Sequence, residues 1–393
     1  MYTQRFGQAS HGRRNRFNRR SNRKVSKGVN PSLFINKITS SVEENVYEPK
    51  FTFEDFNISP ELKSNLKYKG FHKPMPIQDQ AIPHLLQGKD LIGIANTGTG
   101  KTLAFLVPML EKVMNLENEK VLIIAPTREL AVQIEEDLHA LTYRIGVNKV
   151  VCIGGTSINQ QIYKLRMNNQ FVIGTPGRLL DLEKRRALNF NRFTNIVLDE
   201  VDRMFDMGFV DDIKFILSQL PESRQSLFFS ATLDNKIEGL IRSHSKDPVM
   251  VSVKTRETAD HVDQDVVKVA YGQNKMEVLH DMLIKEEFEK VLIFGRTKMG
   301  VHRLSEDLQR RGFKAESIHG DKTQYQRQRS LKNFKENRVN ILVATDVAAR
   351  GLDIPNVSHV INFEAPDNYT DYVHRIGRTG RGNKMGKALT FVQ

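Results

Sequence analysis

The sequence has only one cysteine, Cys152. A single cysteine cannot form an internal disulfide, so a disulfide-stabilised secreted scaffold is excluded and a reducing compartment is favoured. No apolar run approaches the roughly 18 residues that a transmembrane helix needs. The first residues, MYTQRFGQASHGRR, also lack the apolar core of a signal peptide. From these absences we expect a soluble cytoplasmic protein.

Acidic residues are absent from the first 42 positions. The same stretch contains ten Lys or Arg residues, from Arg5 to Lys37, and these account for ten of the thirteen surplus positive charges of the chain. Because it has few aliphatic residues, we predict that the segment 1–50 is a disordered basic arm. Its charge favours binding to a polyanion such as nucleic acid, although an acidic protein or a membrane surface would also attract it.

The chain of 393 residues is long enough for about two domains. From Phe51 onward, short apolar runs alternate with amphipathic stretches of helical spacing, which predicts an α/β fold with mostly parallel sheets flanked by helices. The runs that we interpret as buried strands are residues 90–95, 121–126, 171–176, 195–200, 226–231, 290–295, 340–345 and 388–392.

The two halves of this pattern resemble each other. Residues 120–138 and 290–308 are identical at eight of nineteen positions, at an offset of 170. The same offset places FVIGT at 171–175 over ILVAT at 341–345. We therefore predict two similar domains, residues 51–253 and 266–393, joined by a linker at 254–265. A site in the cleft between them could open and close.

A phosphate-binding loop is predicted where a strand ends in ANTGTGKT and an amphipathic helix follows. Gly98 and Gly100 let the backbone curl so that its N–H groups point at phosphate oxygens, and the amino end of the helix adds a partial positive charge. Lys101 would reach the β and γ phosphates, and Thr102 would hold Mg²⁺. The predicted loop comprises Ala95, which stands where the usual pattern has its first glycine, Asn96, Thr97, Gly98, Thr99, Gly100, Lys101 and Thr102.

An acidic motif, DEVD, follows the apolar run NIVL. Its residues would stand at the carboxyl end of a strand, where α/β sheets bind their ligands. Asp199 can hold Mg²⁺ through water, and Glu200 can orient or deprotonate the attacking water. Together with the phosphate loop, this motif predicts an enzyme that hydrolyses a nucleoside triphosphate.

These two motifs, with others between residues 51 and 393, resemble those of the DEAD-box RNA helicases of superfamily 2. The resemblance implies two tandem RecA-like domains and an ATP-dependent RNA helicase that uses ATP and Mg²⁺ to unwind RNA duplexes locally or to remodel RNA–protein complexes. This sequence has Val201 where the family usually has alanine. Because the change alters packing but no charge, we expect activity to survive.

The resemblance extends to an adenine-reading motif, GFHKPMPIQ, at residues 70–78. The side-chain amide of Gln78 would pair with N6 and N7 of adenine, and Phe71 would offer a face for the ring to stack on. Met75 stands where the family usually has threonine, a departure that leaves Gln78 in place.

Family motifs for RNA binding occur in both halves, at strand ends and turns that would contact the RNA backbone without reading its bases. In the first half they supply Pro126, Thr127, Arg128, Gly154, Gly155, Thr175, Pro176, Gly177 and Arg178. In the second half they supply Gly320, Gln324, Arg327 and Thr345.

Further catalytic residues are implied by the same resemblance. The hydroxyls of Ser230 and Thr232 would bond Asp202 and link hydrolysis to strand separation. Arg378 and Arg381 would reach the γ-phosphate from the second domain, and the second domain would also supply Asp353 to the ATP ribose. An alternative for HRIGRTGR is a basic helix face that only binds RNA, but its glycines argue against a long regular helix.

Other functions remain open from the sequence. The motifs do not physically exclude DNA, so a DNA helicase or translocase is a rival of the same class. An ATP-gated RNA clamp, whose role is binding, is a rival of another class. A transport ATPase is disfavoured because no membrane segment and no second phosphate loop are found. We expect a monomer whose RNA binding is largely independent of sequence, through backbone and 2′-OH contacts.

The basic arm leads to a first prediction. Deleting residues 1–42 should weaken RNA binding at low salt. Positive side chains that contact RNA phosphates release bound counterions, and this release favours binding most when the salt concentration is low. The slope of log affinity against log salt should flatten by about 0.7 for each phosphate of single-stranded RNA that the arm neutralises. ATP turnover at saturating RNA should change little. The measurement is RNA affinity over a salt series, and an unchanged slope would show that the arm does not contact RNA.

Overall fold

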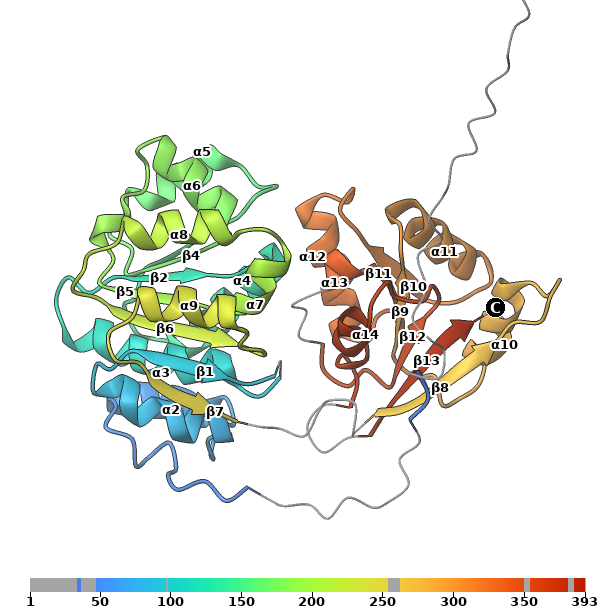
Figure 1. The fold of residues 1–393 in the computed structure, drawn as a ribbon, viewed down its shortest axis with the longest axis horizontal. Coiled ribbons are helices and arrows are strands. Elements are labelled where there is room, and N and C mark those ends of the chain that lie inside the picture. The colour runs from blue at the N-terminus through green and yellow to red at the C-terminus, as the bar shows by residue number, and fades with distance from the viewer. Residues whose placement is uncertain are drawn as a thin grey trace, which may run out of the picture.

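The computed structural model describes residues 34–36, 47–96, 98–253, 262–349, 354–380 and 385–392. It consists of two α/β domains that lie beside each other, each with a central sheet flanked by helices (Figure 1). All strand pairs within both sheets are parallel. None of the helices among these residues is both long enough and apolar enough to cross a membrane.

The first sheet has seven strands. In spatial order they are β3 (Lys149–Cys152), β4 (Phe171–Gly174), β2 (Val121–Ile124), β5 (Asn195–Leu198), β6 (Gln225–Ser230), β1 (Leu91–Ile94) and β7 (Val249–Ser252). The helices of this domain are α1 (Pro60–Tyr68), α2 (Pro76–Leu86), α3 (Lys101–Asn115), α4 (Arg128–Leu141), α5 (Ile158–Leu165), α6 (Pro176–Lys184), α7 (Val201–Asp206), α8 (Val210–Ser218) and α9 (Asn235–Ser243), with a 3₁₀ turn η2 (Phe190–Arg192).

The second sheet has six strands. In spatial order they are β10 (Ala315–Ile318), β11 (Ile341–Thr345), β9 (Val291–Gly295), β12 (His359–Asn362), β13 (Gly386–Val392) and β8 (Val262–Lys268). The helices are α10 (Lys275–Leu283), α11 (Lys298–Arg310), α12 (Gln324–Lys335), α13 (Asp346–Ala349) and α14 (Tyr369–Ile376).

The two sheets share one strand order. Each strand of the second sheet occupies the place of its counterpart in the first, and only β7 has none. The helices that follow β2 and β9 also begin alike, since the side chain of Thr127 accepts a hydrogen bond from the N–H of Leu130, and that of Thr297 from the N–H of Gly300. The sequence repeat at an offset of 170 therefore corresponds to a repeat in structure.

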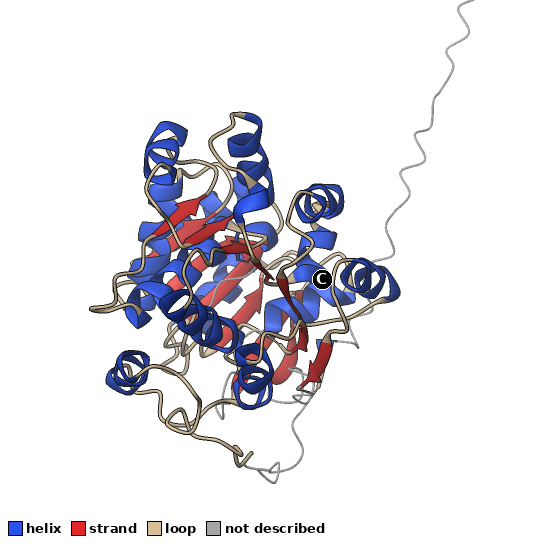
Figure 2. Cartoon of the chain, turned by 90° about the vertical axis from the view of Figure 1, so that its left-hand side faces the viewer, coloured by secondary structure: helices blue, strands red, loops and turns tan. Residues whose placement is uncertain are grey.

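Apolar side chains cover both faces of each sheet, as expected for strands buried on both sides. In β2, Val121 and Ile123 contribute to the core beneath α3 and α4, whereas Leu122 and Ile124 contribute to the core beneath α6 and α8. Figure 2 shows helices on both sides of the strands. This double cover explains why these strands read as continuous apolar runs.

Two boundaries differ from those predicted from the sequence. β8 begins at Val262, inside the stretch 254–265 predicted as a linker. Its sequence, VDQDVVK, is half polar because it forms the sheet edge. In the predicted arm, Phe34 is buried against the second domain, and the hydroxyl of Tyr47 donates a hydrogen bond to Asp79. Residues 1–33, 37–46 and 254–261 of the arm and linker lie outside the described residues.

A buried carboxylate joins three strands of the first sheet at their amino ends. Asp90 is 6% exposed, and its oxygens accept hydrogen bonds of 2.7 Å from the backbone N–H groups of Ser226 and Lys246. Asp90→Ala should leave both N–H groups unpaired and lower the free energy of unfolding of this domain by about 2–4 kcal/mol. Urea unfolding followed by circular dichroism measures this. Asp206→Ala, at an exposed position, is the control and should change stability by less than about 0.5 kcal/mol.

Candidate functional site

The parallel strands bring the predicted motifs to one edge of the first sheet. Each motif directly follows a strand, and the carboxyl ends of parallel strands meet at the same edge. Across the sheet the motifs follow the strand order, with Gly154–Gly155 after β3, TPGR after β4, PTR after β2, DEVD after β5, SAT after β6 and the phosphate loop after β1. The predicted RNA residues therefore occupy one half of the edge and the predicted nucleotide residues the other.

The phosphate loop joins β1 to α3 through left-handed glycines. Gly98 and Gly100 have φ angles of 83° and 86°, which only glycine adopts without strain. A Cβ on Gly100 would also lie 2.3 Å from the Gln78 amide nitrogen, so the loop and the adenine motif are packed together. Lys101 is buried, and its Nζ donates a hydrogen bond of 2.8 Å to the carbonyl of Ala95.

The acidic motif turns sharply between β5 and α7. Glu200 has φ 54° and ψ 55°, a left-handed conformation that is uncommon for a residue with a side chain and is typical of functional sites. Asp199 and Glu200 are 2% and 5% exposed. The carboxylate of Glu200 forms an ion pair of 3.2 Å with Arg203, a buried residue one turn along α7.

Asp202 connects the acidic motif to the strand beside it. Its Oδ2 accepts hydrogen bonds from the N–H groups of Ala231 and Thr232 and from the Thr232 hydroxyl, at 3.1, 3.0 and 3.2 Å. The N–H of Asp202 donates to the Ser230 hydroxyl at 3.2 Å. The predicted contacts of both hydroxyls with Asp202 are therefore present, although the Ser230 hydroxyl accepts from the backbone rather than donating to the carboxylate.

The charges around the acidic motif come from both domains. Burial raises the pKa of Asp199 to about 7, with Lys101 opposing the rise and Glu200 contributing to it. Burial would also raise the pKa of Glu200, but the positive charges of Arg203, Lys101 and Arg378 outweigh it and hold that pKa below its ordinary value. Arg378 belongs to the second domain and is 4% exposed. The structure thus brings a predicted cationic residue of the second domain to the acidic motif of the first.

The acidic motif also fits a divalent cation. A buried carboxylate whose pKa is raised by burial and by neighbouring acids is stabilised by a cation beside it. Among the described residues, no group of three or more His, Cys, Asp or Glu side chains is placed to hold a metal. Mg²⁺ commonly takes one or two protein oxygens and completes its shell with water and substrate phosphates. Asp199 and Thr102 would be those protein ligands.

The predicted RNA residues of the first domain contact one another. The guanidinium of Arg128 lies against Gly154 and Gly155, where a Cβ would come within 2.9 and 2.4 Å of its nitrogens. A side chain at either position would displace the Arg128 guanidinium, and Gly155 has in addition a φ of 78°, which favours glycine. Arg178 donates a hydrogen bond of 2.9 Å to Gln161 of α5. Thr175 directly follows β4 and is the N-cap residue of α6, without a capping hydrogen bond from its side chain. Its counterpart in the repeat, Thr345, is the last residue of β11.

Gln324 and Arg327 join the two domains. Their side chains meet Glu129 of the first domain, with a hydrogen bond of 3.1 Å from Gln324 and an ion pair of 2.9 Å from Arg327. All three are buried, at 2%, 9% and 3% exposure. A Cβ built on Gly155 would lie 3.6 Å from the Cβ of Gln324, an ordinary contact distance, so this glycine lies beside the contact between the domains. Gly320 is exposed at the end of β10.

The adenine motif lies beside the phosphate loop. Phe71 is 40% exposed and Gln78 is 2% exposed. The Gln78 amide donates to the carbonyl of Gly100 at 2.9 Å and accepts from the N–H of Met75 at 2.8 Å. Three predicted residues, Thr97, Asp353 and Arg381, lie outside the described residues.

Sequence reasoning missed three side chains of this region. Glu129 is the acid of the PTREL motif, which otherwise suggests contact with anionic phosphates, and Arg203 pairs with Glu200. Arg375 forms a bidentate ion pair of 2.6 and 2.7 Å with Asp346, inside the HRIGRTGR motif. Their sequence positions gave one usable signal. Glu129 is an acid inside a motif expected to bind phosphates, and Arg203 is a base directly after the acidic motif, so each needs a partner of opposite charge. α14 ends at Ile376, so the three arginines do not form one helix face.

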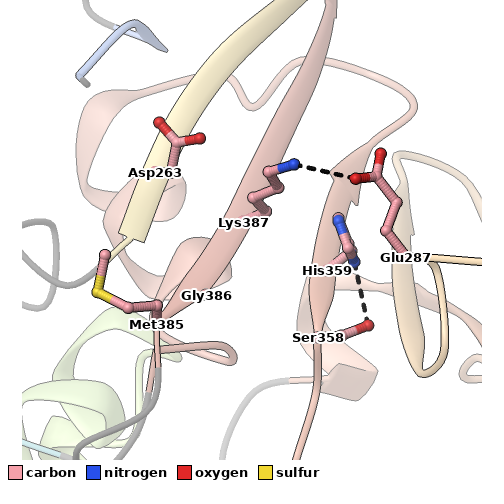
Figure 3. A pocket seen from close by; sticks show the side chains of 7 residues that line it. All are labelled: Asp263, Glu287, Ser358, His359, Met385, Gly386 and Lys387. Carbon is pink, nitrogen blue, oxygen red and sulfur yellow. Dashed lines mark hydrogen bonds and ion pairs between the residues drawn. The ribbon is translucent and has the colours of Figure 1, made fainter. Parts of the chain in front are cut away.

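A hollow of about 620 Å³ lies elsewhere in the second domain (Figure 3). It opens at the amino ends of β12 and β13, the opposite edge from the motifs. An ion pair of 3.3 Å between Lys387 and Glu287 crosses it, and burial lowers the pKa of His359 to about 4. The residues that line it are Asp263, Glu287, Ser358, His359, Met385, Gly386 and Lys387, and none was predicted to bind nucleotide or RNA.

Comparisons with known proteins identify related sequences over both domains. Residues 75–240 match the DEAD/DEAH box helicase family, and residues 274–383 match the helicase conserved C-terminal domain. The chain is 47% identical over 343 residues to the ATP-dependent RNA helicase CshA of Listeria monocytogenes, covering 87% of this chain and 66% of that protein. It is 46% identical over 348 residues to the DEAD-box ATP-dependent RNA helicase CshA of Bacillus subtilis, covering 87% and 69%.

Solved structures also match over both domains. S. cerevisiae Dbp5 bound to RNA and ADP BeF3 has a TM-score of 0.75 and 30% identity, covering 87% of this chain and 89% of that chain. A DEAD box protein from Methanococcus jannaschii has a TM-score of 0.52 and 35% identity, covering 87% and 93%. Of these two structures, the one with the lower sequence identity has the higher TM-score.

The contact between the domains leads to a prediction for Glu129. Glu129→Ala should leave Arg327 buried and unpaired, at a cost of about 3–5 kcal/mol to the closed arrangement. The domains should therefore separate more often. Energy transfer between dyes on cysteines introduced at the exposed positions Lys236 and Arg303 measures the distance. Cys152 should not be labelled, because burial raises its pKa to about 12.

The control for this experiment is Glu136→Ala, an exposed acid on the same helix. It removes the same charge without touching Arg327, so energy transfer should stay as in the unmutated chain. Equal energy transfer in all three proteins would show that Glu129 does not hold the domains together.

Proposed function

Because the chain belongs to the DEAD-box helicase family, we propose that it is an ATP-dependent RNA helicase that locally unwinds RNA duplexes or remodels RNA–protein complexes. The chain spans about two thirds of the length of the curated relatives that it matches. Its activity and substrate are therefore inferred from its own two domains, with the first near residues 51–253 and the second from Val262 onward.

The observation that carries this proposal is the meeting of both domains at the acidic motif. The carboxylate of Glu200 interacts with the charge of Lys101 from its own domain and with that of Arg378 from the other. At the opposite half of the same sheet edge, Glu129 binds Gln324 and Arg327. The predicted nucleotide and RNA halves are thus each completed by the second domain. Closure would couple the two ligands, because each one favours the same arrangement.

For hydrolysis, we propose that the loop at residues 95–102 cradles the phosphates with its N–H groups and that Lys101 neutralises the β and γ phosphates. Mg²⁺, held by Asp199 and Thr102, would supply charge stabilisation of the phosphate oxygens. Glu200 would orient the attacking water, and the lowered pKa of its carboxyl supports an ionised acceptor of protons. Arg378, with Arg381, would stabilise the charge that develops on the γ-phosphate. Phe71 and Gln78 would hold adenine, and Asp353 the ribose.

For RNA, we propose that single-stranded backbone lies along the ends of β3, β4 and β2 and meets Thr345 and Gly320 of the second domain. Arg128, Thr175 and Arg178 would contact phosphates. Gln324 and Arg327 are buried against Glu129, so we revise their proposed role from binding RNA to holding the domains closed around it. Asp202, Ser230 and Thr232 would transmit the state of the nucleotide site to the neighbouring strand.

Several finer features are proposed on physical grounds. The single buried cysteine supports a reducing, cytoplasmic location, and we propose a monomer. A DNA-directed enzyme and an ATP-gated RNA clamp remain the rivals. DNA is disfavoured because the matched Dbp5 structure is bound to RNA.

The experiment that tests the function measures ATP turnover with no nucleic acid, with single-stranded RNA and with DNA of the same sequence. We expect RNA, but not DNA, to stimulate ATP turnover strongly. Multiple-turnover unwinding of a short RNA duplex then separates a helicase from a clamp, which would show long-lived ATP-dependent binding without unwinding. Equal stimulation by DNA would overturn the choice of RNA.

The acidic motif leads to a prediction for Glu200. Glu200→Gln should lower RNA-stimulated ATP turnover by at least about 100-fold, the low end of what a positioned general base contributes. ATP and RNA binding should persist, because Lys101 and Asp199 are unchanged. Phosphate release measures turnover, and a fluorescent ATP analogue measures binding. Loss of ATP binding by a folded Glu200→Gln protein would show that this role is misassigned.

A further inference from the structure

A short piece of the basic arm is docked on the second domain. Residues 34–36, here called the docking segment, lie beside β8 and far along the chain from it (Figure 1). Phe34 is only 1% exposed, whereas its neighbour Ile35 is 48% exposed. The burial of this aromatic side chain, in a segment of the chain that is rich in polar residues, indicates a specific contact.

The surface under Phe34 is apolar and is separate from the main cores of the domain. Phe34 packs in one cluster with Val262 of β8, Ala388 of β13, and Tyr372 and Ile376 of α14. Its ring centre lies 4.7 Å from that of Tyr372. All four of these partners are fully buried. Removing the ring would open this cluster to water, so the surface is built to be covered.

The backbone of the docking segment extends the sheet. Asn36 and Gln264 form an antiparallel bridge, with N–H to carbonyl distances of 3.1 and 2.9 Å in the two directions. β8 is the edge strand of its sheet, and a sheet edge presents unpaired backbone groups that can bind an added strand. The side chain of Gln264 also accepts a hydrogen bond of 3.0 Å from the Tyr372 hydroxyl. The bridge and the aromatic contact therefore support each other.

The docking segment lies against the helix that leads to the cationic motif. α14 carries Tyr372 and Ile376 on the face that meets Phe34, and Arg378 follows two residues after its end. At the same end of α14, Arg375 is held by Asp346 at 2.6 and 2.7 Å. Arg378 thus follows a helix that is fixed on one side by an ion pair and on another by Phe34.

We propose that residues 34–36 are an intramolecular docking element that attaches the basic arm to the second domain and holds α14 in position. Phe34 is a positioning residue that acts on Arg378 through α14. Nine of the ten positive charges of the arm precede Phe34, so RNA bound by the arm is held against the domain that supplies the cationic motif. The effect on turnover rests on the proposed function, whereas the docking itself does not.

The docking is tested by hydrogen exchange in the full chain, read at the N–H of Gln264, which donates to the carbonyl of Asn36. Phe34→Ala should speed exchange at this amide at least tenfold. Ile35→Ala, the matched control at the exposed neighbour, should leave it within about twofold. Exchange in β2 and β5 should be unchanged in both variants, which shows that the first domain is folded. Unchanged exchange at Gln264 in Phe34→Ala would overturn the docking.

The positioning role is tested by ATP turnover at saturating RNA. Phe34→Ala should lower kcat severalfold with KM for ATP unchanged, and Phe34→Leu, which keeps an apolar side chain, should restore most of it. Faster exchange at Gln264 with an unchanged kcat would overturn the positioning role. Absence of RNA-stimulated turnover in the unmutated chain would instead contradict the proposed function. The hydrogen-exchange result would still test the docking, because the docking does not depend on that function.

Discussion

The parallel alignment of strands is the constraint on which the whole site depends. Every strand of the first sheet runs in one direction, so every carboxyl end reaches the same edge. Motifs that are far apart in the chain become neighbours there in the order of the strands. The phosphate loop after β1 lies next to the SAT motif after β6, which lies next to the acidic motif after β5. The contact of Asp202 with Thr232 is a direct result of this order.

Charged side chains are buried where the two domains meet. Glu129 of the first domain forms an ion pair with Arg327 of the second, and the charge of Arg378 from the second domain helps to lower the pKa of Glu200 in the first. A charge without its partner inside a protein is costly, whereas the same charge in water is not. Such pairs therefore stabilise the arrangement in which the two domains are in contact, but only when the acid and the base meet each other. An enzyme that must close on its ligands and reopen is well served by contacts of this kind.

In our proposal, the basic arm has a structural role in addition to its charge. A disordered tail would affect RNA binding only through electrostatics, which salt screens. Docking through Phe34 adds a short-range apolar contact that salt does not screen, and it joins the arm to the helix that precedes Arg378. The proposed docking would therefore attach the basic arm to the domain that carries the cationic motif.

Much of this protein could be predicted from its sequence. Buried parallel strands read as apolar runs because both of their faces are covered, and glycine positions in the phosphate loop follow from φ angles near 85°. The repeat at an offset of 170 predicted two sheets, and the comparisons confirmed the family. β8 was missed because this edge strand is half polar. The docking of Phe34 was missed because the aromatic residues of the arm are scattered and show no periodicity.

The sequence by itself predicted the central apolar strands and the side chains that we expect to carry the chemistry, because these predictions depend on local spacing and residue type. Only the tertiary structure decided which of those side chains meet. Glu129 and Arg327 are 198 positions apart and Glu200 and Arg378 are 178 apart, and no local pattern relates them. The ion pair of Glu129 with Arg327, and the effect of Arg378 on the pKa of Glu200, depend on how the two domains are placed and not on any single motif.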